Sequence, residues 1–467
     1  MEGKIKNCVC KQEDTVEKDV KKSRPFFVNF ASCVKEIISK FMYMKKSFVL
    51  CFLAIMFGCK QEDMVDTEKF RLWCVSPIST IDDSKVHLIW GTMCYDKMLR
   101  PYEFVAPDEI DIYIAQNEMS NFQKIIEVDN NGSYTVDKLQ NGKPYFFYFV
   151  SKKKGFKPLF SDTIMAVPNS RNNFEILQKC EEEHVPSLSN VSIAHKKNKI
   201  AYVDKYYYWN GGSNCCMAVS ILIANMDGSE KELVKINGYH PSWSPANDKV
   251  AFHYDDTYTY VNNVGWISQI ALFDYETKSI SQLTNDNSIK YSPVFSKNGE
   301  LLLFQSSKYI PYSPGMDATN IWLLNLKTLE SFQITDISKT SLRTVERPCW
   351  IDNDRFLFHG AYSERKNPYQ LFESSVSKKQ ITKIFESKWN DYNPSVSPDQ
   401  AKIAFISNRS GMNQVWIYHI YKKTFSQITG YSNNESLSYE WSNIEWLDNS
   451  TIVFTINENQ LVKQIIE

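Results

Sequence analysis

One phrase recurs six times in the second half of the chain and limits the folds that the chain can adopt. Each copy has an apolar segment, a polar turn and a second apolar segment that carries an aromatic residue. The matching aromatics are Tyr202, Phe252, Phe304, Phe358, Phe405 and Phe454, with steps of 50, 52, 54, 47 and 49 residues between them. A repeat of this length with four short strands per unit predicts a β-propeller, because no single unit can bury both of its faces alone.

The last unit reaches the end of the printed chain at Glu467 before a fourth strand is complete. The segment Asn173–Cys180, which comes directly before the first repeat, can supply the missing strand. An open ring would leave two long sheet edges exposed, and proteins avoid such edges. We therefore predict a closed six-bladed β-propeller over residues 173–467.

Two copies of the phrase carry a more specific resemblance. They read "PSWSPANDKVAF" at 241–252 and "PSVSPDQAKIAF" at 394–405. Both resemble the TolB-like propeller repeat of the Tol system, although Ala246 and Gln400 replace its expected turn residues. The resemblance implies a TolB-like ring in the second half of the chain.

Residues 70–168 show a different pattern, in which apolar and polar residues alternate. Runs such as "KVHLIWG" at 85–91 and "EIDIYIA" at 109–115 predict short half-buried strands. A segment of this size suits a sandwich of two sheets. The positions of Trp90, Tyr113, Leu139 and Tyr145 resemble those of a fibronectin type III domain, which implies that Tyr145 is its corner tyrosine. An unrelated seven-stranded sandwich is the alternative, and either would serve as a spacer or adhesion module. The predicted fold class is thus all-β, with a fibronectin type III-like sandwich followed by the propeller.

A signal for export comes before the sandwich, in "MKKSFVLCFLAIMFGCKQED" at 44–63. The uncharged run Ser47–Gly58 is shorter than the roughly 20 residues of a membrane-spanning helix, but it suits a signal peptide. Gly58-Cys59 resembles the cleavage box of bacterial lipoproteins, which implies that Cys59 is lipidated and anchors the protein. The alternative is a buried helix that ends in Gly-Cys. We expect a signal peptide over 44–58, a linker over 59–69, and a mis-called or extended start over 1–43.

The anchor predicts the location of the protein. An outer-membrane lipoprotein is expected, and the acidic residues that follow Cys59 resemble signals that send some lipoproteins to the cell surface. The periplasmic and the outer face both stay open.

Charge and cysteine content exclude several classes of function. The formal net charge is −1, and no basic stripe marks a nucleic-acid partner. The chain has 11 cysteines, but none stands in a CxxC motif or a cysteine and histidine cluster with zinc spacing. We expect no cofactor and no metal. His253 and His359 occupy equivalent places in their repeats, and satisfied histidines are the favoured interpretation over metal ligands.

The candidate site lies where the inner strands of the propeller begin, because these segments converge on the axis. The predicted ligand-binding residues at the channel mouth are His240, Tyr291, Ser292, Glu346, Arg347, Tyr392 and Asn393, together with Tyr239 and either Trp441 or Ser442. Arginine, amide and aromatic side chains can hold a carboxylate, a sugar or a peptide terminus. The alternative is that these side chains only satisfy buried backbone groups.

The favoured function is a noncatalytic module that binds a protein or a glycan and contacts the membrane through Cys59. No nucleophile elbow, zinc-protease motif or phosphate-binding loop occurs in the sequence. One alternative is a propeller enzyme acting on polysaccharide, for which Glu346 is the obvious acid at the channel mouth. The other alternative is a periplasmic envelope scaffold of the Tol type.

Overall fold

The structure is a computed structural model in which part of the chain is described. The described residues are 70–72, 75–91, 103–129, 132–169, 174–179, 187–209, 215–255, 267–286, 288–307, 319–364, 367–430, 437 and 442–466. They belong to one compact unit that begins at Asp66. The predicted signal peptide, the linker, Cys59 and Trp441 lie outside these residues. Within them, no helix is long and apolar enough to cross a membrane.

The first part of this unit is a sandwich of two antiparallel sheets. One sheet has the order β2 (Ser76–Asp82), β3 (Lys85–Gly91) and β7 (Ser133–Val136). The other has the order β10 (Ile164–Ala166), β8 (Tyr145–Lys152), β5 (Glu109–Gln116) and β6 (Gln123–Val128), and β9 (Leu159–Phe160) also pairs with β8. A short parallel pair joins β1 (Phe70–Leu72) to β4 (Glu103–Val105).

The sandwich core follows from the alternation in its strands. Trp90 of β3 meets Phe149 of β8 edge to face, with 5.2 Å between the ring centres. The hydroxyl of Tyr145 accepts a hydrogen bond of 3.0 Å from the backbone N–H of Gln140, which is the bond of a tyrosine corner. The inward-facing residues of both sheets thus form one apolar core.

Six four-stranded antiparallel sheets follow, and we number them as blades 1 to 6. Blade 1 comprises β12 (Ser189–Ala194), β13 (Lys199–Trp209), β14 (Cys215–Asn225) and β15 (Glu232–Ile236), and blade 2 comprises β16 (Gly238–Trp243), β17 (Lys249–Asp255), β18 (Ser268–Asp274) and β19 (Ile280–Gln282). Blade 3 comprises β20 (Ile289–Phe295), β21 (Leu301–Ser307), β22 (Thr319–Asn325) and β23 (Ser331–Gln333). Blade 4 comprises β24 (Leu342–Trp350), β25 (Arg355–Tyr362), β26 (Gln370–Ser375) and β27 (Thr382–Lys383), preceded by the short helix η1 (Ile337–Lys339). Blade 5 comprises β28 (Asp391–Val396), β29 (Lys402–Ser407), β30 (Gln414–His419) and β31 (Thr424–Gln427).

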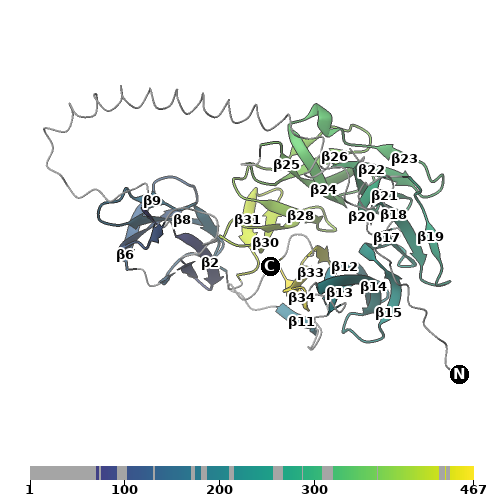
Figure 1. Ribbon diagram of the computed structural model, residues 1–467, viewed down its shortest axis with the longest axis horizontal. Helices are drawn as coiled ribbons and strands as arrows, with labels where there is room; N and C mark the ends of the chain where they lie inside the picture. The colour runs from purple at the N-terminus through teal and green to yellow at the C-terminus, as the bar shows by residue number, and fades with distance from the viewer. Residues whose placement is uncertain are drawn as a thin grey trace, which may run out of the picture. The chain divides into compact units, whose positions relative to one another are not determined.

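Blade 6 closes the ring with strands from both ends of the propeller. Its strands are β32 (Ile444–Trp446), β33 (Thr451–Ile456), β34 (Gln460–Ile465) and β11 (Phe174–Lys179). Strand β11 pairs with β34, so the predicted closure by the segment before the first repeat is confirmed. The inner strands of successive blades contact one another, and β12 contacts β32. Figure 1 shows β33 of blade 6 beside β12 of blade 1. The predicted six-bladed, all-β propeller is therefore the observed fold.

The repeated phrase is explained by the positions of its residues in each blade. All six matching aromatics lie on second strands and are buried. At the end of the inner strand, Trp350 donates from its indole nitrogen to the carbonyl of Val294 at 3.1 Å, and Trp446 donates to the carbonyl of Ser395 at 3.0 Å. Each of these bonds joins neighbouring blades, which fixes one blade against the next.

A second phrase, Gln-x-Thr, forms a polar clamp at the outer strands. In blade 5, Gln427 donates to the carbonyl of Thr429 at 2.8 Å, and the Thr429 hydroxyl accepts from the N–H of Val415 at 2.8 Å. Gln282 and Thr284 repeat both contacts in blade 2. The clamp satisfies backbone groups where the outer strand ends.

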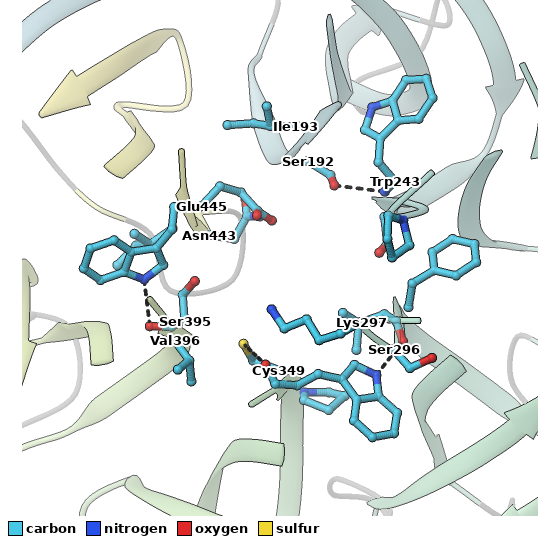
Figure 2. A pocket seen from close by; sticks show the side chains of 18 of the residues that line it. Ser192, Ile193, Trp243, Ser296, Lys297, Cys349, Ser395, Val396, Asn443 and Glu445 are labelled. Atoms are coloured by element: carbon cyan, nitrogen blue, oxygen red, sulfur yellow. Dashed lines mark hydrogen bonds between the residues drawn. The ribbon is translucent and has the colours of Figure 1, made fainter. Parts of the chain in front are cut away.

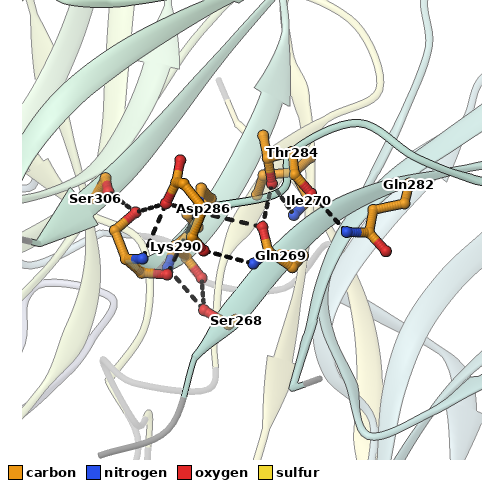
Figure 3. A network of polar contacts seen from close by, with 9 residues as sticks. Ser268, Gln269, Ile270, Gln282, Thr284, Asp286, Lys290 and Ser306 are labelled. Carbon is orange, nitrogen blue, oxygen red and sulfur yellow. Dashed lines mark hydrogen bonds and ion pairs between the residues drawn. The ribbon is translucent and has the colours of Figure 1, made fainter. Parts of the chain in front are cut away.

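Figure 3 shows the clamp of blade 2 joined to a buried lysine of blade 3. Lys290 is 1% exposed, and its ammonium group donates to Asp286 at 2.6 Å and to Gln269 at 3.3 Å. Burial lowers the pKa of Lys290, and the Asp286 carboxylate opposes that effect. The network thus compensates a charge placed between two blades.

A second buried charge lies in blade 5. Arg409 and Asp391 have 1% and 0% exposed side chains, and Arg409 donates to the Asp391 carboxylate at 2.7 Å. The guanidinium lies 4.3 to 5.8 Å from the centres of five rings, which belong to Phe385, Trp389, Phe405, Trp416 and Phe425. The carbonyl of Arg409 also accepts from the N–H of Met165 in the sandwich, at 2.6 Å. One buried pair therefore lies at a contact between sandwich and propeller.

Candidate ligand-binding site in the propeller channel

The inner strands of blades 1 to 5 are each interrupted at the same place. Five residues there adopt left-handed backbone conformations, and we call them the bulge ring: Asn190 (φ 49°), His240 (φ 49°), Ser292 (φ 49°), Arg347 (φ 54°) and Asn393 (φ 50°). In each blade the pairing with the second strand shifts across this residue. Such β-bulges redirect side chains and are common beside functional sites. Four of the five were predicted as site residues, and Asn190 was not.

A hydrogen bond within the bulge ring crosses the channel. Arg347 of blade 4 donates to the side-chain oxygen of Asn190 in blade 1 at 2.9 Å. In a ring of six, these two blades are opposite each other. Asn393 donates from its amide to the carbonyl of Ser442 in blade 6 at 2.6 Å. The bulge ring therefore narrows the channel.

The second strands support the bulge ring from behind through three equivalent residues, His253, Gln305 and His359. The backbone N–H of Arg347 donates to Gln305 at 2.9 Å, and that of Asn393 donates to Nδ1 of His359 at 3.2 Å. The Nδ1 atom of His359 thus holds the backbone of Asn393 as an acceptor. The pKa of His253 falls to about 3 because of burial and the nearby Arg347 charge.

These contacts give the two histidines structural partners. His253 is 2% exposed and packs against the rings of Tyr239 and His240, while His359 is 1% exposed. Among the described residues, no group of three side chains is placed to hold a metal ion.

A cavity of about 630 Å³ lies along the axis, lined by inner strands of all six blades. Of the predicted residues, His240, Ser292, Arg347 and Asn393 line it. The other predicted residues, Tyr239, Tyr291, Glu346, Tyr392 and Ser442, do not contribute to its lining.

These residues make contacts within the blades or between neighbouring blades. Tyr291 packs edge-on against His253, and Tyr392 packs edge-on against His359. Burial favours a raised pKa for Glu346, but contacts with His359 and Thr344 lower that pKa below its ordinary value. Thr344 donates to the carboxylate of Glu346 at 3.0 Å, and Nε2 of His359 lies 3.7 Å from it. Glu346 is thus an anion held by the wall.

Two oppositely charged residues of the cavity, Lys297 and Glu445, lie outside the bulge ring. Figure 2 shows the Lys297 side chain reaching toward the centre of the channel from blade 3, with Glu445 and Asn443 of blade 6 across from it. Burial raises the pKa of Glu445 to about 7, against the opposing effect of Lys297. Asn443 donates to its carboxyl group at 3.3 Å.

Two further titratable groups line the same section of the channel. Burial raises the pKa of the Cys349 thiol, so this thiol is protonated at neutral pH. Burial and Lys297 lower the pKa of His195, so its imidazole is neutral there. This part of the cavity therefore presents the lysines Lys196 and Lys297, the carboxyl groups of Asp352 and Glu445, and several neutral polar groups.

The sequence prediction did not include Lys297, Glu445 or Cys349. Lys297 stands where the repeats of blades 2 and 5 have Pro245 and Pro398. Glu445 and Cys349 stand where those repeats have serine. These departures from the repeat could have identified the three residues, because positions that break a structural pattern are expected at functional sites.

Comparison with known proteins supports the propeller assignment. No family model matches the chain. Over 158 residues, the chain is 26% identical to a protein TolB homolog of Chlorobium luteolum. The propeller is similar to TolB. The match covers 34% of this chain and 33% of that relative, so the chain spans about a third of the length of the curated relative.

Solved structures give distant similarities. TolB from Acinetobacter baumannii has a TM-score of 0.37 and 16% identity, covering 70% of this chain and 77% of that one. An oligogalacturonate lyase from Vibrio parahaemolyticus has a TM-score of 0.39 and 11% identity, covering 73% and 90%. An acylaminoacyl peptidase from Pyrococcus horikoshii has a TM-score of 0.40 and 16% identity, covering 60% and 46%. At these TM-scores the similarities carry no argument about function, which rests on the residues of this chain.

Proposed function

We propose that this protein is a noncatalytic binding module whose propeller recognises a protein or glycan ligand in its axial channel. Lipidated Cys59 anchors it in the outer membrane, and a fibronectin type III-like sandwich serves as the spacer. The signal-peptide pattern at 44–59 supports the anchor, and the Tyr145 corner supports the spacer.

The observation that carries the binding role is the channel cavity. Its volume of about 630 Å³ lies within the range of small-ligand sites, and all six blades contribute to its lining. The polar side chains that converge on it include His240, Ser292, Arg347 and Asn393 of the bulge ring. A ligand or the end of a polymer can therefore contact several blades at once.

A binding panel tests this role. The purified full chain is presented to arrays of glycans and peptides, beside a Lys297→Met variant. Lys297 is exposed, so this change removes a charge from the cavity without disturbing a core. Lys327→Met is the control, because Lys327 is also an exposed lysine of blade 3 but does not line the cavity. Binding weakened by Lys297→Met alone supports the proposal, and equal binding by all three proteins excludes the channel as the site.

The anchor has its own test. Cells grown with a fatty-acid analogue should label the wild-type protein and leave Cys59→Ser unlabelled. Label retained by Cys59→Ser would remove this cysteine as the anchor.

One observation favours the polysaccharide enzyme as a second candidate. Glu445 has a pKa of about 7, which suits a general acid. Asp352 also lines the cavity, but its carboxylate is held by Arg355 at 2.8 Å. Incubation with a panel of polysaccharides should release no new chain ends, and release that depends on Glu445 would establish the enzyme instead.

A further inference from the structure

Two opposite charges face the same cavity without forming an ion pair. Lys297 follows β20 of blade 3, and Glu445 lies on β32 of blade 6. Blades 3 and 6 are opposite in the ring, and Figure 2 shows the two side chains approaching the channel from opposite sides. Within the described residues, neither side chain takes part in an ion pair with an N–O distance of 4.0 Å or less.

The two charges nevertheless act on each other. The positive charge of Lys297 stabilises the Glu445 carboxylate against the effect of burial. The protein thus places a carboxyl group in a channel wall and leaves its compensating cation across the cavity. A molecule that fills the cavity therefore lies between a cation on one side and a carboxyl group on the other.

The other charged groups of the cavity are engaged or distant from this pair. Arg347 donates to Asn190, and Asp352 accepts from Arg355. His195 is neutral because its pKa is lowered, and Lys196 is an exposed residue that lies at the blade 1 turn. Lys196 is thus a second cation of the cavity, but Lys297 is the one that lies across from Glu445 and acts on its carboxyl group.

We propose that the channel takes a small zwitterionic ligand, or a zwitterionic end group, with its ammonium at Glu445 and its carboxylate at Lys297. This inference rests on the proposed function, since it names the ligand class of the same cavity. Each end gains a charge-assisted hydrogen bond, which is stronger than a neutral one.

The test uses ω-amino acids of increasing chain length, from γ-aminobutyrate to ε-aminohexanoate and longer. Each is compared with its N-acetyl form, which lacks the cation, and with its carboxamide, which lacks the anion. Calorimetry on the full chain should find one preferred length, with affinity reduced about tenfold or more when either charge is removed. The preferred length then measures the separation between Lys297 and Glu445.

Two variants assign each charge to its partner. In Glu445→Gln, the parent compound and its N-acetyl form should bind equally, and in Lys297→Met the parent and its carboxamide should bind equally. Lys327→Met should behave as wild type. The dependence on the ammonium should also weaken as the pH falls below about 7, because protonated Glu445 no longer attracts a cation.

Four results would overturn the inference. An N-acetyl form that binds as tightly as its parent would make the cavity an anion receptor. A carboxamide that binds as tightly would make it a cation receptor. If no amino acid binds while the glycan or peptide panel shows Lys297-dependent binding, this inference fails and the proposed function stands. If neither panel binds the channel, both fail.

Discussion

Removing one partner of the buried ion pair in blade 5 should strongly destabilise the propeller. Asp391 and Arg409 are 0% and 1% exposed, so Asp391→Ala leaves a guanidinium charge buried with its ion partner gone. Breaking a buried pair in this way costs about 3–5 kcal/mol. Domain stabilities are about 5–15 kcal/mol, so the variant loses a large part of the total. The five rings around Arg409 reduce the cost only partly, because cation–π contacts are weaker than the lost pair.

A second variant separates the charge effect from packing. The double replacement Asp391→Leu with Arg409→Met removes both charges and keeps apolar volume, so it should be more stable than Asp391→Ala. Urea denaturation followed by tryptophan fluorescence measures the global effect. Hydrogen exchange of the β28 and β29 amides measures the local one. Glu386→Ala is the control, since it breaks an exposed pair with Lys383 and should leave the midpoint nearly unchanged.

The assay can refute this reasoning in two ways. A loss below about 1 kcal/mol for Asp391→Ala would show that the aromatic cage alone accommodates the cation. A double variant less stable than Asp391→Ala would show that packing of the long Arg409 side chain, and not its charge, matters most.

Three other changes test the fold and the channel. Glu445→Gln should gain stability relative to wild type as the pH rises, because the wild-type pKa is raised from 4.5 to about 7 and the folded state therefore holds its proton more tightly than the unfolded state. The gain, measured by urea unfolding, should reach up to about 3 kcal/mol between pH 4 and pH 8, and a pH-independent difference would contradict it. Deleting Phe174–Lys179 removes the strand that pairs with β34 and should lower the thermal midpoint by about 5 °C or more, whereas an unchanged midpoint would mean that the ring does not need this strand. Thr429→Val takes the acceptor from the N–H of Val415 and should cost about 1–3 kcal/mol in urea unfolding, unless the clamp is dispensable.

The blade architecture was predictable because repetition and alternation are direct consequences of it. Each blade needs an aromatic at the same depth of its second strand, so Tyr202 and Phe454 stand at the same place in their repeats. The closing strand was predictable for a different reason, since a ring with an open edge would be exposed to wrong pairing. The fibronectin type III assignment of the sandwich rests on spaced residues such as Trp90 and Tyr145 and stays a prediction.

The site was predictable only in part, because a bulge changes which side chains face the channel. Strand alternation alone does not tell which of two neighbouring residues faces the channel. Arg347 lines the cavity, whereas Glu346 is hydrogen-bonded to Thr344. Left-handed backbone conformations are commonest at glycine. None of the five bulge-ring residues is a glycine, so the sequence does not predict the bulges. Lys297 and Glu445 lie outside the bulge ring, at positions where other repeats have proline or serine. The repeat pattern therefore did not predict charged residues there.

The hydrogen bond from Arg347 to Asn190 limits how far a ligand can extend along the channel. The Arg347 side chain and Asn190 together span the channel from one side of the ring to the other. A polymer that enters the cavity could pass through the ring only after this hydrogen bond is broken. If the ligand of the proposed function is a polymer, the cavity therefore contacts its end group.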